Sequence, residues 1–140
     1  MTFADTASRL SIQAHARFYK AMGGRFAGKR LLLLTTTGRR SGKQRVIPLM
    51  RIEDGHDYVV AASMGGAPSH PGWYHNLMDN PRVMVQVGRT VENRTARITE
   101  GSERERLWAK FVEADKRFAD YASKTDRVIP VVVLEPNESS

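Results

Sequence analysis

The segment Leu31–Thr37 places four leucines directly before three threonines, and this run constrains the fold more than any other part of the chain. A short run that is apolar or β-branched throughout is typical of a strand covered on both faces. Gly38 ends the run, and within the next seven positions come Arg39, Arg40, Ser41, Lys43 and Arg45. A second strand is expected from 45 to 52. The cationic and hydroxyl side chains therefore lie at a tight turn between strands, where they can converge on one anion.

The rest of the chain alternates short strands with turns and helical segments. Strands are expected at 30–36, 45–52, 58–63, 82–87, 91–99 and 129–134, and the pair Asp54-Gly55 is typical of a hairpin. Helices are expected at 7–22, at 72–79 and after a capping box at Ser102 and Glu105, where one side carries Leu107, Trp108, Phe111 and Val112. A polar stretch follows from Asp115 to Asp126. Six strands joined mainly by hairpins predict an α+β fold, an antiparallel barrel with an N-terminal helix and flanking helices.

Length and composition limit the kind of protein. The 140 residues are expected to form a single domain, with the N-terminal helix in 1–24 and the barrel in 30–136. The absence of cysteine excludes disulfides and thiolate chemistry. No signal peptide and no apolar run of bilayer length are visible, so a cytoplasmic location is expected. The net charge of +7 favours an acidic partner.

The N-terminal helix allows two interpretations. One face is basic and carries Arg9, His15, Arg17 and Lys20. An amphipathic helix of this kind more often covers one end of a barrel. The same pattern is also typical of peripheral contact with a membrane surface.

Motifs of hydrolytic and metal-dependent catalysis are missing. The sequence has no G-x-S-x-G elbow, H-E-x-x-H pair, Walker loop or G-x-G-x-x-G. His70 and His75 are five positions apart, a poor spacing for two ligands on one helical face, so no metal site is expected.

A cradle for an anion remains as the main hypothesis. The basic turn alone is more typical of a solvated hairpin tip, and Trp73 alone is more typical of a core residue. In the segment Ser63–Ala67, however, two glycines let backbone amides approach a ligand closely. Together with the indole of Trp73 and the amide of Asn76, these features predict a slot for a planar, acidic molecule.

Three segments carry a family resemblance. They read T-T-T-G-R-R-S-G-K-x-R at Thr35–Arg45, A-S-M-G-G-A-P-S-H-P-x-W-Y-x-N at Ala62–Asn76, and T-D-R-x-I-P-V-V-V-L-E-P at Thr125–Pro136. In order and spacing they resemble the deazaflavin-dependent nitroreductase family, split β-barrel oxidoreductases that use reduced coenzyme F420. The resemblance implies a fold like the FMN-binding split barrels and a cofactor with a deazaflavin ring, a phosphodiester and an oligoglutamate tail. It further implies hydride transfer to an electron-poor acceptor, such as an activated alkene, a quinone or a nitro compound.

The resemblance also implies roles for individual residues. The phosphate and the acidic tail would be held by Arg39, Arg40, Ser41 and Arg45. The groove for the ring would be lined by Val46, Ile47, Pro48, Leu49 and Met50. The ring itself would be flanked by Ala61, Ala62, Ser63, Met64 and Phe118, and the pocket closed by Gly72, Trp73, Tyr74, His75 and Asn76. Two residues would be catalytic: Ser63 as a hydrogen-bonding group near the reacting centre, and Tyr121 as a proton donor.

Two departures from the family pattern bear on the acceptor and on the cofactor. Met64 stands where family members often have lysine. Asp115 and Phe118 stand where the best-known nitroimidazole-activating member has tyrosines, so nitroimidazole reduction is not carried over. The cofactor assignment is kept because the arginines of the basic turn remain.

Two alternative functions stay open. The first is an FMN-binding split-barrel reductase, although a single terminal phosphate matches the dense arginine cluster less well than a polyanionic tail. The second is a non-enzymatic basic barrel that binds nucleic acid. Nucleic acid is not the expected partner, because the aromatic residues mostly have helical core spacing instead of alternating with cations on a strand.

Overall fold

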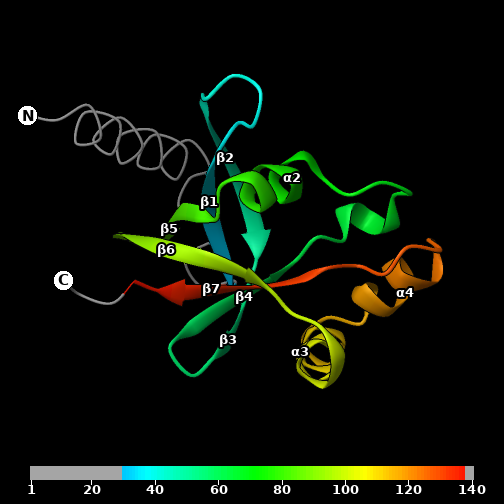
Figure 1. The fold of residues 1–140 in the computed structure, drawn as a ribbon. Helices are drawn as coiled ribbons and strands as arrows, with labels where there is room; N and C mark the ends of the chain where they lie inside the picture. The colour runs from blue at the N-terminus through cyan, green and yellow to red at the C-terminus, as the bar shows by residue number, and fades with distance from the viewer. Residues whose placement is uncertain (1–29, 138–140) are drawn as a thin grey trace, which may run out of the picture.

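The framework is one curled, fully antiparallel sheet of seven strands (Figure 1). The structure is a computed structural model that describes residues 30–137. The sheet order is β2-β1-β5-β6-β7-β4-β3. The strands are β1 (Leu31–Thr37), β2 (Gln44–Met50), β3 (Ile52–Asp54), β4 (Asp57–Ala61), β5 (Arg82–Val87), β6 (Thr90–Ile98) and β7 (Val131–Pro136). The predicted α+β class and antiparallel split barrel are confirmed, with seven strands where six were expected, while the expected helix at 7–22 lies outside the described residues.

Strand β1 is the buried strand that the sequence predicts. Its residues from Leu32 to Thr36 are at most 4% exposed. It pairs with β2 along its whole length, from Leu31 opposite Met50 to Thr37 opposite Gln44, and with β5 on its other edge. Beyond Thr37 the chain closes a tight turn in which the Gly38 amide donates to the Lys43 carbonyl at 2.7 Å. The cations of this turn are therefore anchored at the end of a rigid strand.

The core has two parts, one on each face of the sheet. Because side chains alternate along a strand, Val60 and Val132 enter the first part, whereas Val59 and Val133 enter the second. Helix α2 (Gly72–Asp79) contributes Trp73 and Leu77 to the first part. Helices α3 (Gly101–Ala114) and α4 (Arg117–Ser123) cover the second part. In Figure 1, α2 lies beside β1 and β2, whereas α3 and α4 lie together at another end of the sheet.

Several expected elements differ from those in the structure. The strand expected at 45–52 is interrupted at Arg51, which separates β2 from β3. The Arg51 amide still donates to the Arg30 carbonyl at 2.6 Å, one position beyond the last paired residues of β1 and β2. The last strand begins at Val131, directly after Pro130, because proline has no amide hydrogen to donate. Helix α4 lies inside the stretch from Asp115 to Asp126, where no helix was predicted.

The capping box expected at the start of α3 is also absent. The helix already begins at Gly101, so Ser102 lies inside its first turn, and the N-cap residue Glu100 makes no side-chain capping hydrogen bond. The expected apolar face of this helix is confirmed: Leu107 and Phe111 are fully buried, and Trp108 and Val112 pack against the same cluster. Between residues 30 and 137, no helix has the length and apolar character needed to cross a membrane.

Candidate functional site

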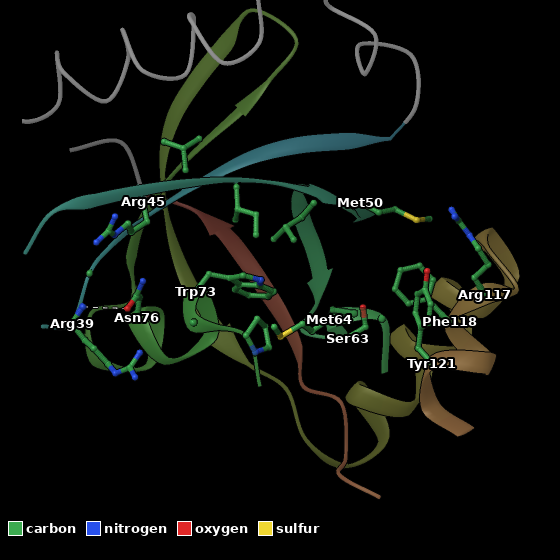
Figure 2. Close-up of a pocket in the computed structure, with 18 of the residues that line it drawn as sticks. Arg39, Arg45, Met50, Ser63, Met64, Trp73, Asn76, Arg117, Phe118 and Tyr121 are labelled. Carbon is green, nitrogen blue, oxygen red and sulfur yellow. Dashed lines mark hydrogen bonds between the residues drawn. The ribbon is translucent and has the colours of Figure 1, made fainter. Parts of the chain in front are cut away.

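A cavity of about 800 Å³ opens between the β1–β2 hairpin, helix α2 and helix α4 (Figure 2). This volume falls within the range of roughly 300–1,000 Å³ that is usual for small-molecule sites. Figure 2 shows a polarity gradient along it, with Arg39 and Arg45 at one end, Trp73, Ser63 and Met64 in the middle, and Met50, Phe118 and Tyr121 at the other end. The cavity can therefore hold a molecule that is anionic at one end and flat and apolar at the other.

The cationic end is formed by Arg39, Arg40, Ser41 and Arg45. Within residues 30–137, no carboxylate forms an ion pair with any of these three arginines. Gly38 is required for the shape of the turn, because a Cβ atom there would lie 2.9 Å from the Ser41 hydroxyl and 3.1 Å from the Lys43 carbonyl. Lys43, which the sequence groups with the other cations, does not line the cavity.

Asn76 of α2 fixes the cationic turn. Its Oδ1 accepts a hydrogen bond of 3.1 Å from the Arg39 amide, drawn as a dashed line in Figure 2, and its Nδ2 donates to the Thr36 hydroxyl at 3.1 Å. Asn76 is 8% exposed and Thr36 is 1% exposed, so the bond between these two side chains is shielded from water, whereas the bond from the Arg39 amide is only partly buried. The amide thus joins the end of β1, the turn and the helix on the cavity wall.

The middle of the cavity is bounded by the segment Ser63–Ala67, called here the glycine loop. Its residues Met64, Gly65 and Gly66 have φ values of 46°, 64° and 83°. Gly66 is buried against α4, where a Cβ atom would lie 2.7 Å from the Tyr121 carbonyl oxygen. The side chain of Ser63 is nearly buried, whereas Met64 is 56% exposed. The loop therefore presents Ser63 beside the cavity while its backbone packs against the helix that carries Tyr121.

The opposite end combines apolar side chains with an ion pair. The Phe118 and Tyr121 rings meet edge to face with centroids 5.4 Å apart, and Met50 completes the wall. Arg117 and Asp115 also line this end, and Arg117 Nη2 lies 2.6 Å from Asp115 Oδ2. The hydrogen bonds from Arg117 hold the pKa of Asp115 below its ordinary value, so this carboxylate is charged at neutral pH.

The structure brings most of the predicted site residues to this cavity. Those that line it are Arg39, Arg40, Ser41, Arg45, Val46, Ile47, Leu49, Met50, Ala61, Ser63, Met64, Gly72, Trp73, Asn76, Phe118 and Tyr121. Their individual roles toward a cofactor stay predictions. The lining also includes Gly38, Gly65, Pro71, Asp115 and Arg117, to which the sequence analysis assigned no individual role at the cofactor. The sequence singles out Asp115 only as a departure from the family pattern, and Arg117 carries no signal beyond lying in a polar stretch. Both residues lie where α3 ends and α4 begins.

Four predicted residues do not line the cavity. Pro48 of β2 does not line the cavity, although its neighbours Ile47 and Leu49 do. Ala62 is fully buried in the core. Tyr74 and His75 lie on a different side of α2 from Trp73 and Asn76, and their rings group with the ring of His70.

Comparison with known proteins gives a consistent answer. The profile of the F420H(2)-dependent quinone reductase family matches residues 7–136. An F420H(2)-dependent quinone reductase of Mycobacterium tuberculosis is 39% identical over 132 residues, which cover 88% of each chain. The solved structure of an F420-H2 dependent reductase, FDR-A, is 51% identical, covers 76% of this chain and 95% of its own, and superimposes with a TM-score of 0.71.

A more distant structure shares the fold alone. The haem storage protein HutZ of Vibrio cholerae is 16% identical and gives a TM-score of 0.62 over 85% of this chain and 90% of its own. The expected relationship to F420-dependent split-barrel oxidoreductases is confirmed, and the chain belongs to the F420H(2)-dependent quinone reductase family.

Proposed function

We propose that the protein binds reduced coenzyme F420 along the cavity and transfers a hydride to a quinone at the aromatic end. Family membership supports an F420-dependent reductase, and the polarity gradient of the cavity supports the orientation of the cofactor. The single observation that carries the orientation is the set of three arginines at one end that have no carboxylate partner among residues 30–137. Activated alkenes and nitro compounds are the alternative acceptors.

The residues present fit this cofactor. Its phosphodiester and glutamate carboxylates match Arg39, Arg40 and Arg45, and each charge-assisted contact contributes about 1.5 to 3 kcal/mol when shielded and much less when exposed. All three side chains are exposed, two on the turn and Arg45 at the start of β2, so the affinity comes from the number of cations and not from any single pair. FMN has one terminal phosphate and therefore uses less of this cationic end. We expect the polyglutamylated deazaflavin to bind more tightly than FMN.

The side chains of this protein orient the reactants and supply a proton. When bound, the reduced cofactor supplies the hydride. Trp73 and Met50 form apolar walls that exclude water from the slot. A quinone that accepts a hydride becomes an anion on one oxygen, and the hydroxyl of Tyr121 is the proposed donor of the proton that completes the hydroquinone. Ser63, on the glycine loop, is the proposed hydrogen-bond donor near the reacting centre.

Steady-state turnover tests this function. Oxidation of reduced coenzyme F420 is followed by absorbance in the presence of a soluble naphthoquinone, an activated alkene or a nitroaromatic compound. We expect the quinone to be reduced with the highest kcat/KM, and Arg89→Ala, which removes an exposed cation from the β5–β6 turn away from the cavity, to match the wild type. Turnover with reduced FMN but not with reduced F420 would reject the proposal.

A further inference from the structure

Arg127 lies behind the glycine loop and does not line the cavity. Its guanidinium donates to three main-chain oxygens: Ser63 at 2.8 Å, Ala67 at 2.8 Å and Ala62 at 3.0 Å. Hydrogen bonds from a charged donor are about twice as strong as neutral ones, and the planar fork of arginine fixes the direction of each. One side chain thus holds the residue before the loop and both ends of the loop.

The loop has a backbone that needs such support. Met64 has φ of 46°, a left-handed conformation that costs a residue with a Cβ atom roughly 1 to 2 kcal/mol, and the next two glycines are also left-handed. The loop makes few bonds of its own, namely Gly66 amide to Ser63 carbonyl at 2.9 Å and Ala67 amide to Met64 carbonyl at 3.1 Å. The contacts from Arg127 are therefore a large part of what holds this shape.

The loop in turn positions helix α4. Gly66 lies so close to Tyr121 that an added Cβ atom would be 2.7 Å from the Tyr121 carbonyl oxygen and 3.1 Å from its Cα atom. A movement of the loop at Gly66 therefore moves the backbone of Tyr121, while a movement at Ser63 moves the other proposed catalytic group. Both groups depend on the same backbone segment.

We propose that Arg127 is a positioning residue of the hydride-transfer site, which holds the glycine loop so that Ser63 and Tyr121 border the same part of the cavity. The inference rests on the proposed function. It assigns a role to a residue that neither the cavity lining nor the comparisons single out.

His70 makes this support dependent on pH. Its Nδ1 lies 2.9 Å from Arg127 Nη1, and this contact requires an unprotonated nitrogen because the guanidinium can only donate. The titratable groups around the ring are Arg127, Tyr74 and His75, with the Tyr74 ring centroid at 4.7 Å and that of His75 at 6.0 Å. Burial lowers the pKa of His70 below 6.5, and the charges of Arg127 and His75 lower it further.

The direction of the pH effect follows from this lowered pKa. The stabilising contribution of His70 is complete above pH 6.5 and is lost as the pH falls through the lower pKa of the folded protein. Below that value two cations are in contact behind the loop. We therefore expect turnover to decrease in acid because the loop loosens.

Substitution of Arg127 tests the proposal. Arg127→Met removes all the donors, and Arg127→Lys keeps the charge but not the three-way fork. The matched control is Arg104→Met. Arg104 is also a partly buried arginine that donates to a main-chain oxygen, that of Ile129 at 2.8 Å, and it does not line the cavity. In Arg127→Met we expect faster amide hydrogen exchange at Gly66 and Ala67 and a kcat lower by on the order of 100-fold. Affinity for the cofactor should change much less, because its anionic part is held at the other end.

The lysine variant should show an intermediate kcat, and it replaces the methionine variant in the test if the latter does not fold. If the amide hydrogen exchange of the loop and the kcat of Arg127→Met match those of Arg104→Met, the proposal is overturned. Hydrogen exchange needs no cofactor, so it separates the support of the loop from the proposed function. If the wild type does not oxidise reduced F420 but the loop amides of Arg127→Met still exchange faster, the proposed function is rejected and the support of the loop by Arg127 is kept.

A substitution of His70 that leaves Arg127 in place tests the part of the proposal that concerns pH. His70→Gln keeps an oxygen that accepts from Arg127 but does not titrate. As the pH falls from 6.5 through the lowered pKa of His70, we expect the kcat of this variant to fall less than that of the wild type. Parallel pH profiles of the two proteins would show that His70 has no part in holding the loop.

Discussion

The Asn76 side chain holds the cationic turn against α2, and its replacement tests whether this end of the cavity is preformed. Asn76→Ala removes the acceptor of the Arg39 amide and the donor to the Thr36 hydroxyl. Thr36 is 1% exposed, so its hydroxyl would lose a partner where water cannot replace it, at a cost of about 1 to 3 kcal/mol. The Arg39 amide lies on the exposed turn and can bond to water instead. We expect the free energy of unfolding to fall by about 2 to 3 kcal/mol.

Asn76→Asp has nearly the same shape and serves as the matched comparison. A carboxylate still accepts from the Arg39 amide, and the Thr36 hydroxyl can donate to it, so stability should remain closer to that of the wild type. The new negative charge lies beside the cationic end, where repulsion of an anionic ligand at contact distance amounts to about 1 kcal/mol in water and about 4 kcal/mol when partly shielded. Affinity for the cofactor should therefore fall by about tenfold or more.

Urea unfolding and cofactor titration at low and high salt separate the two effects. The alanine variant should lose mainly stability, with a loss of affinity that is nearly independent of salt. The aspartate variant should lose mainly affinity, and the loss should shrink in high salt as the charge is screened. If both variants are as stable as the wild type and bind the cofactor as tightly as it does, Asn76 neither holds the turn nor lies near a bound anion.

Three further predictions concern other parts of the molecule. Arg40→Ala combined with Arg45→Ala should raise the cofactor Kd by at least about tenfold without lowering the melting temperature, because both side chains are exposed; an unchanged Kd in a fluorescence titration would contradict the assigned anion site. Tyr121→Phe should keep the cofactor Kd and lower kcat for the quinone by about 100-fold or more, and an unaltered kcat would exclude its hydroxyl as proton donor. The hydrogen bonds from Arg106 lower the pKa of Asp54 to about 2, so Asp54→Asn should destabilise the fold by about 1 kcal/mol at pH 7. The difference in the free energy of unfolding between the wild type and Asp54→Asn should be lost as the pH falls from 3.8 through 2. Urea unfolding of both proteins across this range checks it.

Parts of the fold that depend on local chemistry could be predicted from the sequence. The run of leucine and threonine specifies β1, because only a strand covered on both faces accommodates such a run without exposing it. Gly38 and the cations behind it specify the turn, and the apolar spacing from Leu107 to Phe111 specifies the buried side of α3. Trp73 and Asn76 lie three positions apart, so the expected helix α2 brings both to the cavity.

Features that depend on distant contacts could not be predicted. After the break at Arg51 the chain leaves its pairing with β1, and β3 pairs with β4 instead, a change of partner that no local pattern reveals. Helix α4 has only seven residues and is held by the packing of Phe118 against Phe111 and Trp108. The contacts of Arg127 join positions more than 55 residues apart along the chain, so its motif is visible in the sequence but its role is not.

Direct titration of the protein with oxidised coenzyme F420 is the measurement that tests the central claim most directly. Binding is followed by fluorescence, with FMN as the competitor and with a deazaflavin that lacks the glutamate tail as the control ligand. We expect saturable binding at micromolar cofactor and weaker binding of the truncated ligand and of FMN. The difference in affinity should narrow in high salt, because the arginines proposed to hold the tail are exposed. No binding at micromolar F420, or FMN bound more tightly than F420, would contradict the account.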